Sequence, residues 1–179
     1  MCGIAGILNI NNRDEITADC LKQMLAAIRH RGPDEFGLYR GKEIGLGHAR
    51  LSIIDLSGGK QPMSNESRSL WITFNGEIFN YLELREDLLK RGHRFATSSD
   101  TEVIIHLYED YGTGCLQYLN GQFAFAIWDS NKKELFIARD RLGIRPLFYT
   151  KCNNRFYFAS EIKAILATGE IRGEIDPIA

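Results

Sequence analysis

The chain of 179 residues lacks both a long apolar run and a cluster of basic residues. A membrane-spanning helix needs about 18–20 consecutive apolar residues, and no stretch approaches that length, so none is expected. The formal net charge is −1, which gives no electrostatic reason to expect nucleic acid or an anionic membrane surface as a partner. The apolar N-terminus has no preceding basic residue and no cleavage pattern, so no signal peptide is predicted and a cytoplasmic location is expected.

Cysteine is also scarce, and its spacing excludes two kinds of site. The four cysteines stand at positions 2, 20, 115 and 152, without a CxxC pair or a comparable pairing with histidine. This spacing argues against a zinc site and against a disulfide framework, so no metal is expected. Cys20 and Cys115 fall within helical patterns and are interpreted as small buried apolar residues. Only Cys2 has an unusual position.

The apolar periodicity predicts one α+β domain over the whole chain, with no internal repeat or low-complexity segment. Helices are predicted over 17–30, after Asn80, after Asp100, and over 114–119 and 161–167; strands are predicted over 4–10, 45–54, 70–74, 123–128, 134–138, 147–150 and 156–159. Asn80 and Glu83 have the spacing of a capping box. The late hairpin-like strands favour largely antiparallel sheets over a doubly wound parallel fold.

Cys2 would become the first residue if Met1 were removed, as is usual before a small second residue. It would then carry a thiol and a free α-amine, whose pKa of about 8 leaves a neutral base available near physiological pH. Such an amine can activate its own side chain as a nucleophile. On position alone, a buried apolar residue that begins a strand is the better interpretation. Gly3 and Gly6 indicate either a close approach of substrate or backbone, or a strand bulge.

Asn75 and Gly76 follow a predicted strand and have two interpretations. A side-chain amide and the next backbone N–H can direct two donors at one developing oxyanion. Asn-Gly is equally a common hairpin-turn dipeptide. A helix follows rather than a returning strand, which weakens the hairpin without excluding it.

Three further polar residues are ambiguous in the same way. Arg50 stands in an apolar, β-branched run and needs a partner, either a substrate carboxylate or, more simply, an internal salt bridge. Asp100 caps a helix or recognises an ammonium group. His48 is a general base or, as is commoner for a lone histidine on a strand, structural. Asp129 and Asp140 are interpreted as solvated strand ends.

Several longer runs together resemble one family. MCGIAG at 1–6, HRGPD at 30–34 and FNGEIFNY at 74–81 are similar to motifs of the class II glutamine amidotransferases, which are N-terminal nucleophile hydrolases. Within that family, GHARLSIIDLSGGKQPM at 47–63, LNGQFAFAIWD at 119–129, ARDRLGIRPLFY at 138–149 and FASEIKAIL at 158–166 resemble the glutaminase domains of asparagine synthetases most closely. The resemblance covers nearly the whole chain.

The resemblance implies a four-layer αββα sandwich and a set of site residues. Cys2 would be the nucleophile, with its freed amine as the proton shuttle. Asn75 and Gly76 would form the oxyanion hole. Arg50 would bind the α-carboxylate of glutamine and Asp100 its α-ammonium group. The backbone around Ile53, Ile54 and Glu77 would complete the pocket, and the loop 30–34 would close over the substrate.

The same resemblance implies glutamine as substrate and no cofactor for residues 1–179, interpreted as a single glutaminase domain. ATP and magnesium would belong to a C-terminal synthetase domain, in cis or on a separate subunit, that amidates aspartate with the released ammonia. A homodimer is among the assemblies it allows. The alternatives are a non-catalytic glutamine-binding or regulatory module, a structural partner for a synthetase, and a glutaminase that serves another acceptor, such as a sugar acid.

Overall fold

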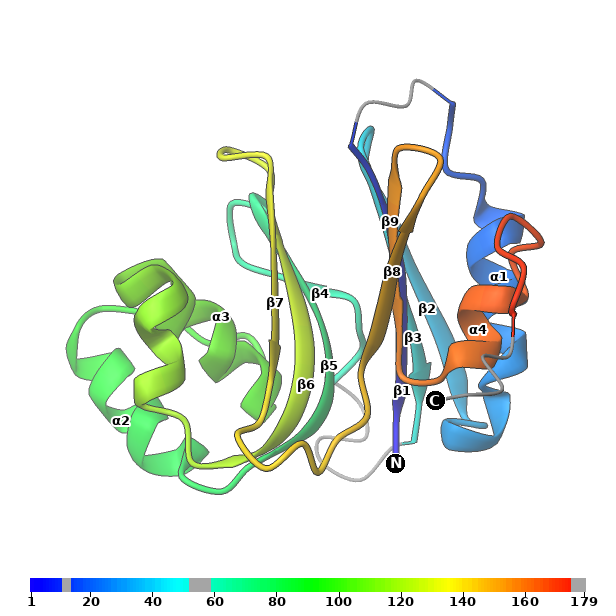
Figure 1. Cartoon of the computed structure of the whole chain (residues 1–179). Coiled ribbons are helices and arrows are strands. Elements are labelled where there is room, and N and C mark those ends of the chain that lie inside the picture. The colour runs from blue at the N-terminus through cyan, green and yellow to red at the C-terminus, as the bar shows by residue number, and fades with distance from the viewer. Residues whose placement is uncertain (11–13, 52–58, 175–179) are drawn as a thin grey trace.

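A computed structural model describes residues 1–10, 14–51 and 59–174. Two antiparallel sheets face each other and helices cover their outer faces (Figure 1). The first sheet has the order β2 (Glu35–Arg40), β3 (Ile44–Arg50), β1 (Gly3–Asn9), β9 (Arg155–Ala159) and β8 (Phe148–Cys152). The second has the order β4 (Met63–Ser64), β5 (Leu70–Ile78), β6 (Gly121–Asp129) and β7 (Glu134–Arg139).

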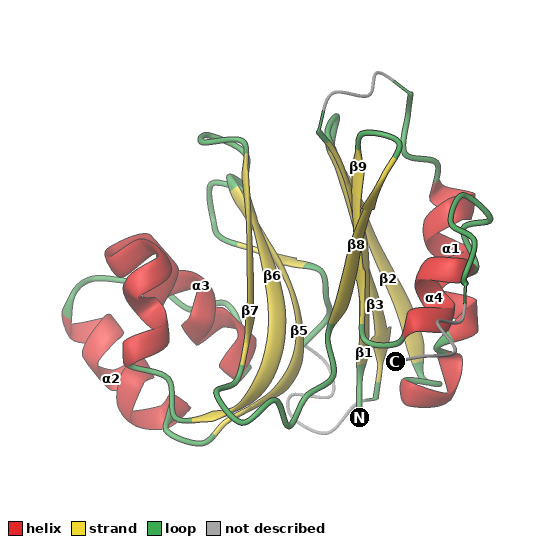
Figure 2. Cartoon of the chain, in the orientation of Figure 1, coloured by secondary structure: helices red, strands yellow, loops and turns green. Residues whose placement is uncertain are grey.

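Helices cover the outer face of each sheet, as Figure 2 shows. The first sheet is covered by α1 (Ala18–Ala27) and α4 (Ile162–Leu166), and the second by α2 (Tyr81–Lys90) and α3 (Asp100–Tyr111). Short 3-10 helices, η1 (Arg29–Arg31) and η2 (Gly112–Gln117), follow α1 and α3. Among the described residues, no helix is both long and apolar enough to cross a bilayer.

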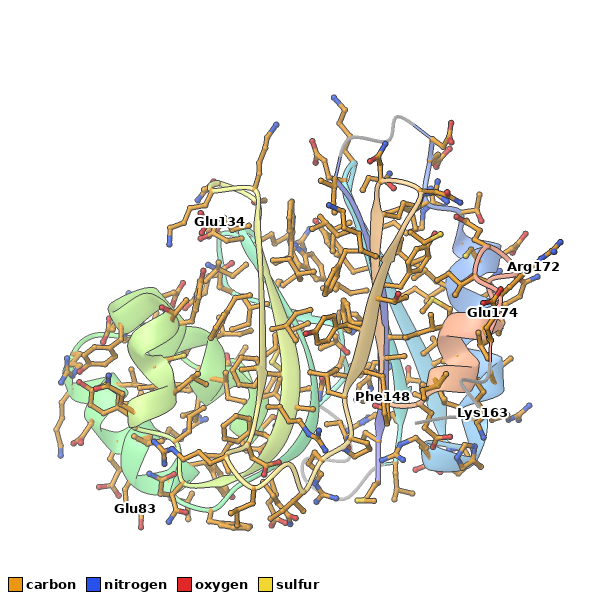
Figure 3. All side chains as sticks on the ribbon, viewed as in Figure 1. Glu83, Glu134, Phe148, Lys163, Arg172 and Glu174 are labelled. Atoms are coloured by element: carbon orange, nitrogen blue, oxygen red, sulfur yellow. The ribbon has the colours of Figure 1, made fainter. Side chains whose placement is uncertain are left out.

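Side-chain alternation along the strands divides the apolar interior into three cores. In β6, Phe123 and Phe125 pack toward α3, whereas Ala124 and Ala126 lie between the sheets. The core between the sheets also includes residues from β1, β3 and β9, namely Ile4, Ile44, Leu46 and Phe158. Figure 3 shows side chains from both sheets filling this layer. The predicted α+β class and the four-layer αββα arrangement are therefore confirmed.

Strand β5 is longer than predicted. It runs through Asn75 and Gly76 to Ile78 and pairs with β6 throughout, with Gly76 opposite Phe123. The predicted strand end at residue 74 and the hairpin alternative are therefore wrong. A Cβ atom at Gly76 would lie 2.2 Å from the Gln122 carbonyl oxygen, so glycine is required here by the close approach of β6 rather than by a turn.

The helix caps also differ from the predictions. Asn80 precedes α2 but makes no side-chain cap hydrogen bond, so the predicted capping box does not form. Its side chain instead accepts from the Asn120 N–H at 3.0 Å and donates to the Tyr118 carbonyl at 2.9 Å. Ser99 caps α3 by accepting from the Thr101 N–H. The predicted cap, Asp100, is the first helical residue, which leaves its carboxylate available for another role.

Two short strands were not predicted. In β2, half-exposed and exposed residues alternate, and the strand has no apolar run that would identify it. The two-residue β4 is too short for any pattern. The predicted strand over 45–54 is β3, which ends at Arg50; residues 52–54 lie outside the described part of the chain.

Candidate active site

One pocket, of about 90 Å³, collects most of the predicted site residues from both sheets. Cys2 directly precedes β1, Arg50 ends β3, Asn75 and Gly76 belong to β5, and Asp100 begins α3. The described residues that line the pocket are Met1, Cys2, His48, Arg50, Leu51, Gly59, Gln61, Phe74, Asn75, Gly76, Glu77, Ser99, Asp100, Thr101 and Arg145. Ile53 and Ile54 lie outside the described residues.

The thiol of Cys2 lies against the backbone of Leu51, the residue after β3. The Leu51 N–H donates to the sulfur at 3.4 Å, and the sulfur lies 3.5 Å from the Leu51 carbonyl oxygen. Burial raises the pKa of the Cys2 thiol above its ordinary value, although the Leu51 N–H and the positive charge of Arg50 oppose this effect. A neutral thiol in this position needs a nearby base before it can act as a nucleophile.

The segment 30–34 braces the residue that carries the thiol. Arg31 Nε donates to the Cys2 carbonyl at 3.0 Å, and Arg31 Nη1 donates to Glu161 Oε1 at 3.0 Å. His30 Nε2 lies 2.8 Å from the same Glu161 oxygen. Burial would raise the pKa of Glu161, but Arg31, Lys163 and His30 together lower it to about 2. None of the residues 30–34 lines the pocket, and closure of this loop over the substrate stays a prediction.

The edge of β5 presents three successive backbone N–H groups on the side away from β6. The Phe74 N–H donates to Gln61 Oε1 at 2.6 Å, and the Ile78 N–H donates to Asp100 Oδ2 at 3.1 Å. Because hydrogen-bonding directions alternate along a strand, the Gly76 N–H projects from the same edge between them. Asn75 is buried, and its Nδ2 has no hydrogen-bond partner among the described residues. Asn75 and Gly76 both line the pocket, and their joint role as oxyanion donors stays a prediction.

The two charged residues of the pocket have opposite signs. Arg50 is buried and its Nη1 lies 3.7 Å from Glu35 Oε2, so the expected internal ion pair and a place in the pocket are both observed. Asp100 is buried as well. Burial, together with the negative charge of Glu77, raises its pKa to about 6, although the Ile78 and Thr101 N–H groups act to lower it. A cationic ligand group would remove this penalty on the ionised carboxylate.

His48 joins the two sheets at the pocket wall. Its Nε2 donates to the Phe74 carbonyl at 3.1 Å, since that oxygen can only accept. Burial and the neighbouring Arg50 outweigh this hydrogen bond and lower the pKa of His48 to about 4, so the ring is neutral near pH 7. Thr73 makes a second link between the sheets, donating to the Gly47 carbonyl at 3.1 Å. These contacts favour the structural interpretation of His48, although its Nδ1 has no partner among the described residues and the residue lines the pocket.

The interpretation of Asp140 and Asp129 as solvated strand ends is wrong, because both are buried. Asp140 accepts from the Ile144 N–H at 2.9 Å and from the Arg145 N–H at 3.0 Å. Burial acts to raise its pKa, but these donors hold it below its ordinary value. The Asp140 carboxylate thus shapes the loop that brings Arg145 to the pocket. The sequence interpretation missed this contribution, although both residues lie inside the run ARDRLGIRPLFY.

The site combines a candidate nucleophile, Cys2, at the start of the central strand β1 with hydrogen-bond donors on the facing sheet. This arrangement is the one expected from the resemblance to class II glutamine amidotransferases. The family model of the glutamine amidotransferase domain matches residues 1–179, and the chain belongs to this family. This confirms the resemblance to class II glutamine amidotransferases.

Individual relatives show which members of the family this chain is similar to. The chain is 47% identical over 169 residues to asparagine synthetase [glutamine-hydrolyzing] 1 of Bacillus subtilis, covering 93% of this chain and 27% of that protein. It is 42% identical to putative asparagine synthetase [glutamine-hydrolyzing] 2 of Methanocaldococcus jannaschii, covering 96% and 36% of the two chains. Among solved structures, the glutamine phosphoribosylpyrophosphate amidotransferase of B. subtilis matches with a TM-score of 0.78 and 26% identity, over 94% of this chain and 44% of that one. The chain therefore spans less than half the length of each of these relatives.

Proposed function

We propose that this domain hydrolyses glutamine to glutamate and ammonia through a thioester on Cys2. The observation that carries the proposal is the unpartnered Asn75 amide, buried in the same pocket as the Cys2 thiol. A buried amide donor without a partner costs about 1–3 kcal/mol, and a negatively charged oxygen in the pocket would satisfy it.

Substrate binding is assigned to the two charged residues. Arg50 offers a guanidinium to the α-carboxylate of glutamine, and Asp100 offers a carboxylate to the α-ammonium group. Glu77 and the backbone around Ile53 and Ile54 complete the proposed set. The opposite charges would orient the amino-acid end of the substrate and direct its side-chain carboxamide toward Cys2.

The reaction follows from the site residues. Removal of Met1 frees the α-amine of Cys2, which takes the thiol proton. The sulfur attacks the carboxamide carbon, and the resulting oxyanion accepts hydrogen bonds from Asn75 Nδ2 and the Gly76 N–H. The C–N bond then breaks, the protonated amine donates its proton to the leaving ammonia, and a γ-glutamyl thioester remains. Water attacks the thioester, glutamate leaves, and the thiol is regenerated.

A second part of the proposal concerns the reaction that consumes the released ammonia. The relatives named as glutamine-hydrolysing asparagine synthetases support transfer to an ATP-dependent amidation of aspartate. That step, with its ATP and magnesium, is assigned to a synthetase domain in cis or on a separate subunit, so the glutaminase domain of residues 1–179 would need no cofactor of its own. We place the reaction in the cytoplasm. A homodimer is one assembly that we propose to test.

The test is release of glutamate and ammonia by the purified chain, with intact-mass determination of its N-terminus on the same sample. We expect turnover from chains that lack Met1, and none from Cys2→Ala. Cys20→Ala, at a second half-buried cysteine that does not line the pocket, is the matched control and should keep full activity. Glutamine binding without turnover in the processed wild-type chain would contradict the proposal and favour a glutamine-binding module.

A further inference from the structure

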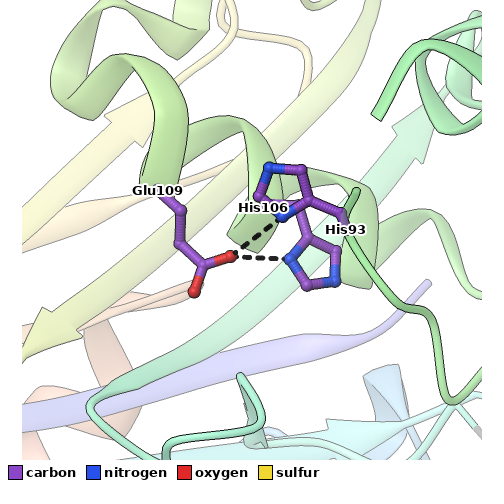
Figure 4. Close-up of side chains that lie close together, drawn as sticks. All are labelled: His93, His106 and Glu109. Carbon is purple, nitrogen blue, oxygen red and sulfur yellow. Dashed lines mark hydrogen bonds and ion pairs between the residues drawn. The ribbon is translucent and has the colours of Figure 1, made fainter. Parts of the chain in front are cut away.

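A cluster of two histidines and a glutamate lies outside the pocket, on the helical layer of the second sheet. His93 belongs to the segment between α2 and α3, and His106 and Glu109 lie one turn apart on α3. Figure 4 shows both imidazole rings turned toward the Glu109 carboxylate. None of the three lines the active-site pocket, and the glutaminase proposal uses none of them.

The three donor atoms converge on one point. Glu109 Oε2 lies 2.7 Å from His106 Nδ1 and 3.5 Å from His93 Nδ1. The three ligand atoms lie within 4.8 Å of one another. A tetrahedral zinc site with bonds of about 2.0–2.1 Å separates its ligand atoms by about 3.4 Å. The longest side would therefore need to contract by no more than about 1.4 Å, and the 2.7 Å side would need to lengthen by about 0.7 Å.

Neighbouring groups hold each ligand in orientation. Asp110 Oδ1 lies 2.9 Å from His93 Nε2, the nitrogen that faces away from Glu109. Asn65 Nδ2 donates to Glu109 Oε1 at 2.8 Å, which leaves the other carboxylate oxygen for the cluster. His106 is buried and packs against the edge of Phe95. A carboxylate behind a histidine and an amide behind a carboxylate are typical second partners of metal ligands.

The local charge also favours a cation. The carboxylates of Glu102, Glu109 and Asp110 surround the two rings, Glu66 adds negative charge, and Arg91 is the cation paired with Asp110, at 3.7 Å. The two imidazole rings lie with their centroids 4.7 Å apart, so one ion could contact both.

We propose that His93 Nδ1, His106 Nδ1 and Glu109 Oε2 bind Zn²⁺, with water as the fourth ligand. Two imidazoles and one carboxylate suit zinc better than magnesium or calcium, which prefer oxygen ligands alone. The ion would tie the segment 91–99 to α3. Because His106 lies six residues beyond Asp100, at about 1.5 Å per residue, the ion would sit about 9 Å along the helix from the pocket and stabilise it from a distance.

The test is calorimetric titration of the metal-free chain with zinc chloride, together with thermal unfolding. The measurement is made in Cys2→Ala, because the freed amine and thiol of Cys2 would chelate zinc themselves. We expect one bound ion and a higher Tm with zinc. This background has no turnover under the glutaminase proposal, so the two proposals succeed or fail separately.

Variants identify the ligands. In the same background, His93→Asn should weaken zinc affinity by about a hundredfold or more, and Asp110→Asn by about tenfold, the range seen for residues behind a metal ligand. His30→Asn, a surface histidine outside the cluster, is the matched control and should bind zinc as the parent does. Glu109→Gln gives a second ligand variant of nearly unchanged size, read by the same titration if His93→Asn does not fold. Absence of zinc binding, or affinity unchanged in the ligand variants, would overturn the proposal.

Discussion

The two sheets contribute unlike halves to the active-site pocket. On the first sheet, the residues at the pocket are held by other parts of the protein: Arg31 binds the Cys2 carbonyl, and Arg50 pairs with Glu35. On the second sheet, the Asn75 amide has no partner among the described residues, and burial raises the pKa of Asp100 to about 6. Cys2 and Arg50 are thus fixed by contacts within the protein, whereas the Asn75 amide is left to be completed by a ligand; His48 Nδ1, on the first sheet, also lacks a partner among the described residues.

This difference separates two kinds of contribution to a site. A satisfied residue on the first sheet stabilises the fold, so its loss should reduce stability and displace the nucleophile. The Asn75 amide on the second sheet has no partner to lose, so its removal should affect binding or rate more than stability. The comparison would fail if loss of a first-sheet residue changed only binding or rate, or if loss of Asn75 reduced stability.

The largest expected effect concerns Gly76, which allows β5 to pack against β6 and is proposed to supply one oxyanion donor. In Gly76→Ala, the new Cβ would meet the Gln122 carbonyl oxygen at 2.2 Å and Phe123 Cα at 2.7 Å, both backbone atoms that cannot move aside alone. We expect a loss of about 3 kcal/mol in the free energy of unfolding, measured by urea denaturation. Gly114→Ala, whose nearest neighbour would be Tyr111 Cβ at 3.9 Å, should change it by less than about 0.5 kcal/mol. Equal stability of the two variants would contradict the close approach at β5.

Removal of the unpartnered amide tests the second-sheet half directly. Asn75→Ala should lower kcat by about a hundredfold, because one of two oxyanion donors is lost. The same change should leave the free energy of unfolding within about 1 kcal/mol of the wild-type value, since the amide has no partner to lose. Steady-state kinetics and denaturation on one preparation give both values. A variant that loses stability but keeps kcat would show that Asn75 is structural.

The sequence could predict much of this pocket because its chemistry stands in short contiguous motifs. Cys2, Arg50, Asn75 and Asp100 were each singled out from local context, and the structure brings all four to one pocket. Their roles remain predictions. Local context did not predict the secondary structure of Asn75-Gly76. This pair has the composition of a turn but lies inside a strand, because pairing with β6 outweighs the local preference.

Long-range pairings could not be predicted from one sequence. Arg31 and Glu161 are 130 residues apart, and nothing local indicates that they meet. The same holds for the buried Asp140, whose partners lie in a loop rather than in solvent. His93 and His106 have no standard zinc-motif spacing, so only the fold reveals that their rings converge. Such contacts depend on how the layers pack, which periodicity does not specify.

The Glu161 carboxylate tests the first-sheet half. Its pKa of about 2 is below its ordinary value, so the ionised form stabilises the fold above about pH 4.5, and this stabilisation is lost as the pH falls toward 2. Because its side chain is 24% exposed, we expect Glu161→Gln to lower the free energy of unfolding at pH 7 by about 2 kcal/mol. The variant should also reduce kcat severalfold by releasing Arg31 from its position under Cys2. The exposed Glu83→Gln should change neither value, and an unaltered acid-unfolding curve for Glu161→Gln would refute the bracing role.

The smallest expected effect is the pH dependence of glutamine affinity, which tests the other half through Asp100. A carboxyl group with a pKa of about 6 is ionised at pH 7.5 and about nine-tenths protonated at pH 5, so it loses its attraction for the α-ammonium group as the pH falls. Glutamine Kd, measured calorimetrically in Cys2→Ala to exclude turnover, should rise about tenfold between these pH values, or about 1.4 kcal/mol. Asp100→Asn in the same background should bind weakly at both pH values, with little change between them. An unchanged Kd in the parent would mean that Asp100 is already ionised at pH 5 or does not contact the ammonium group. The difference between the two sheets at the pocket would then rest on the unpartnered amide of Asn75 alone.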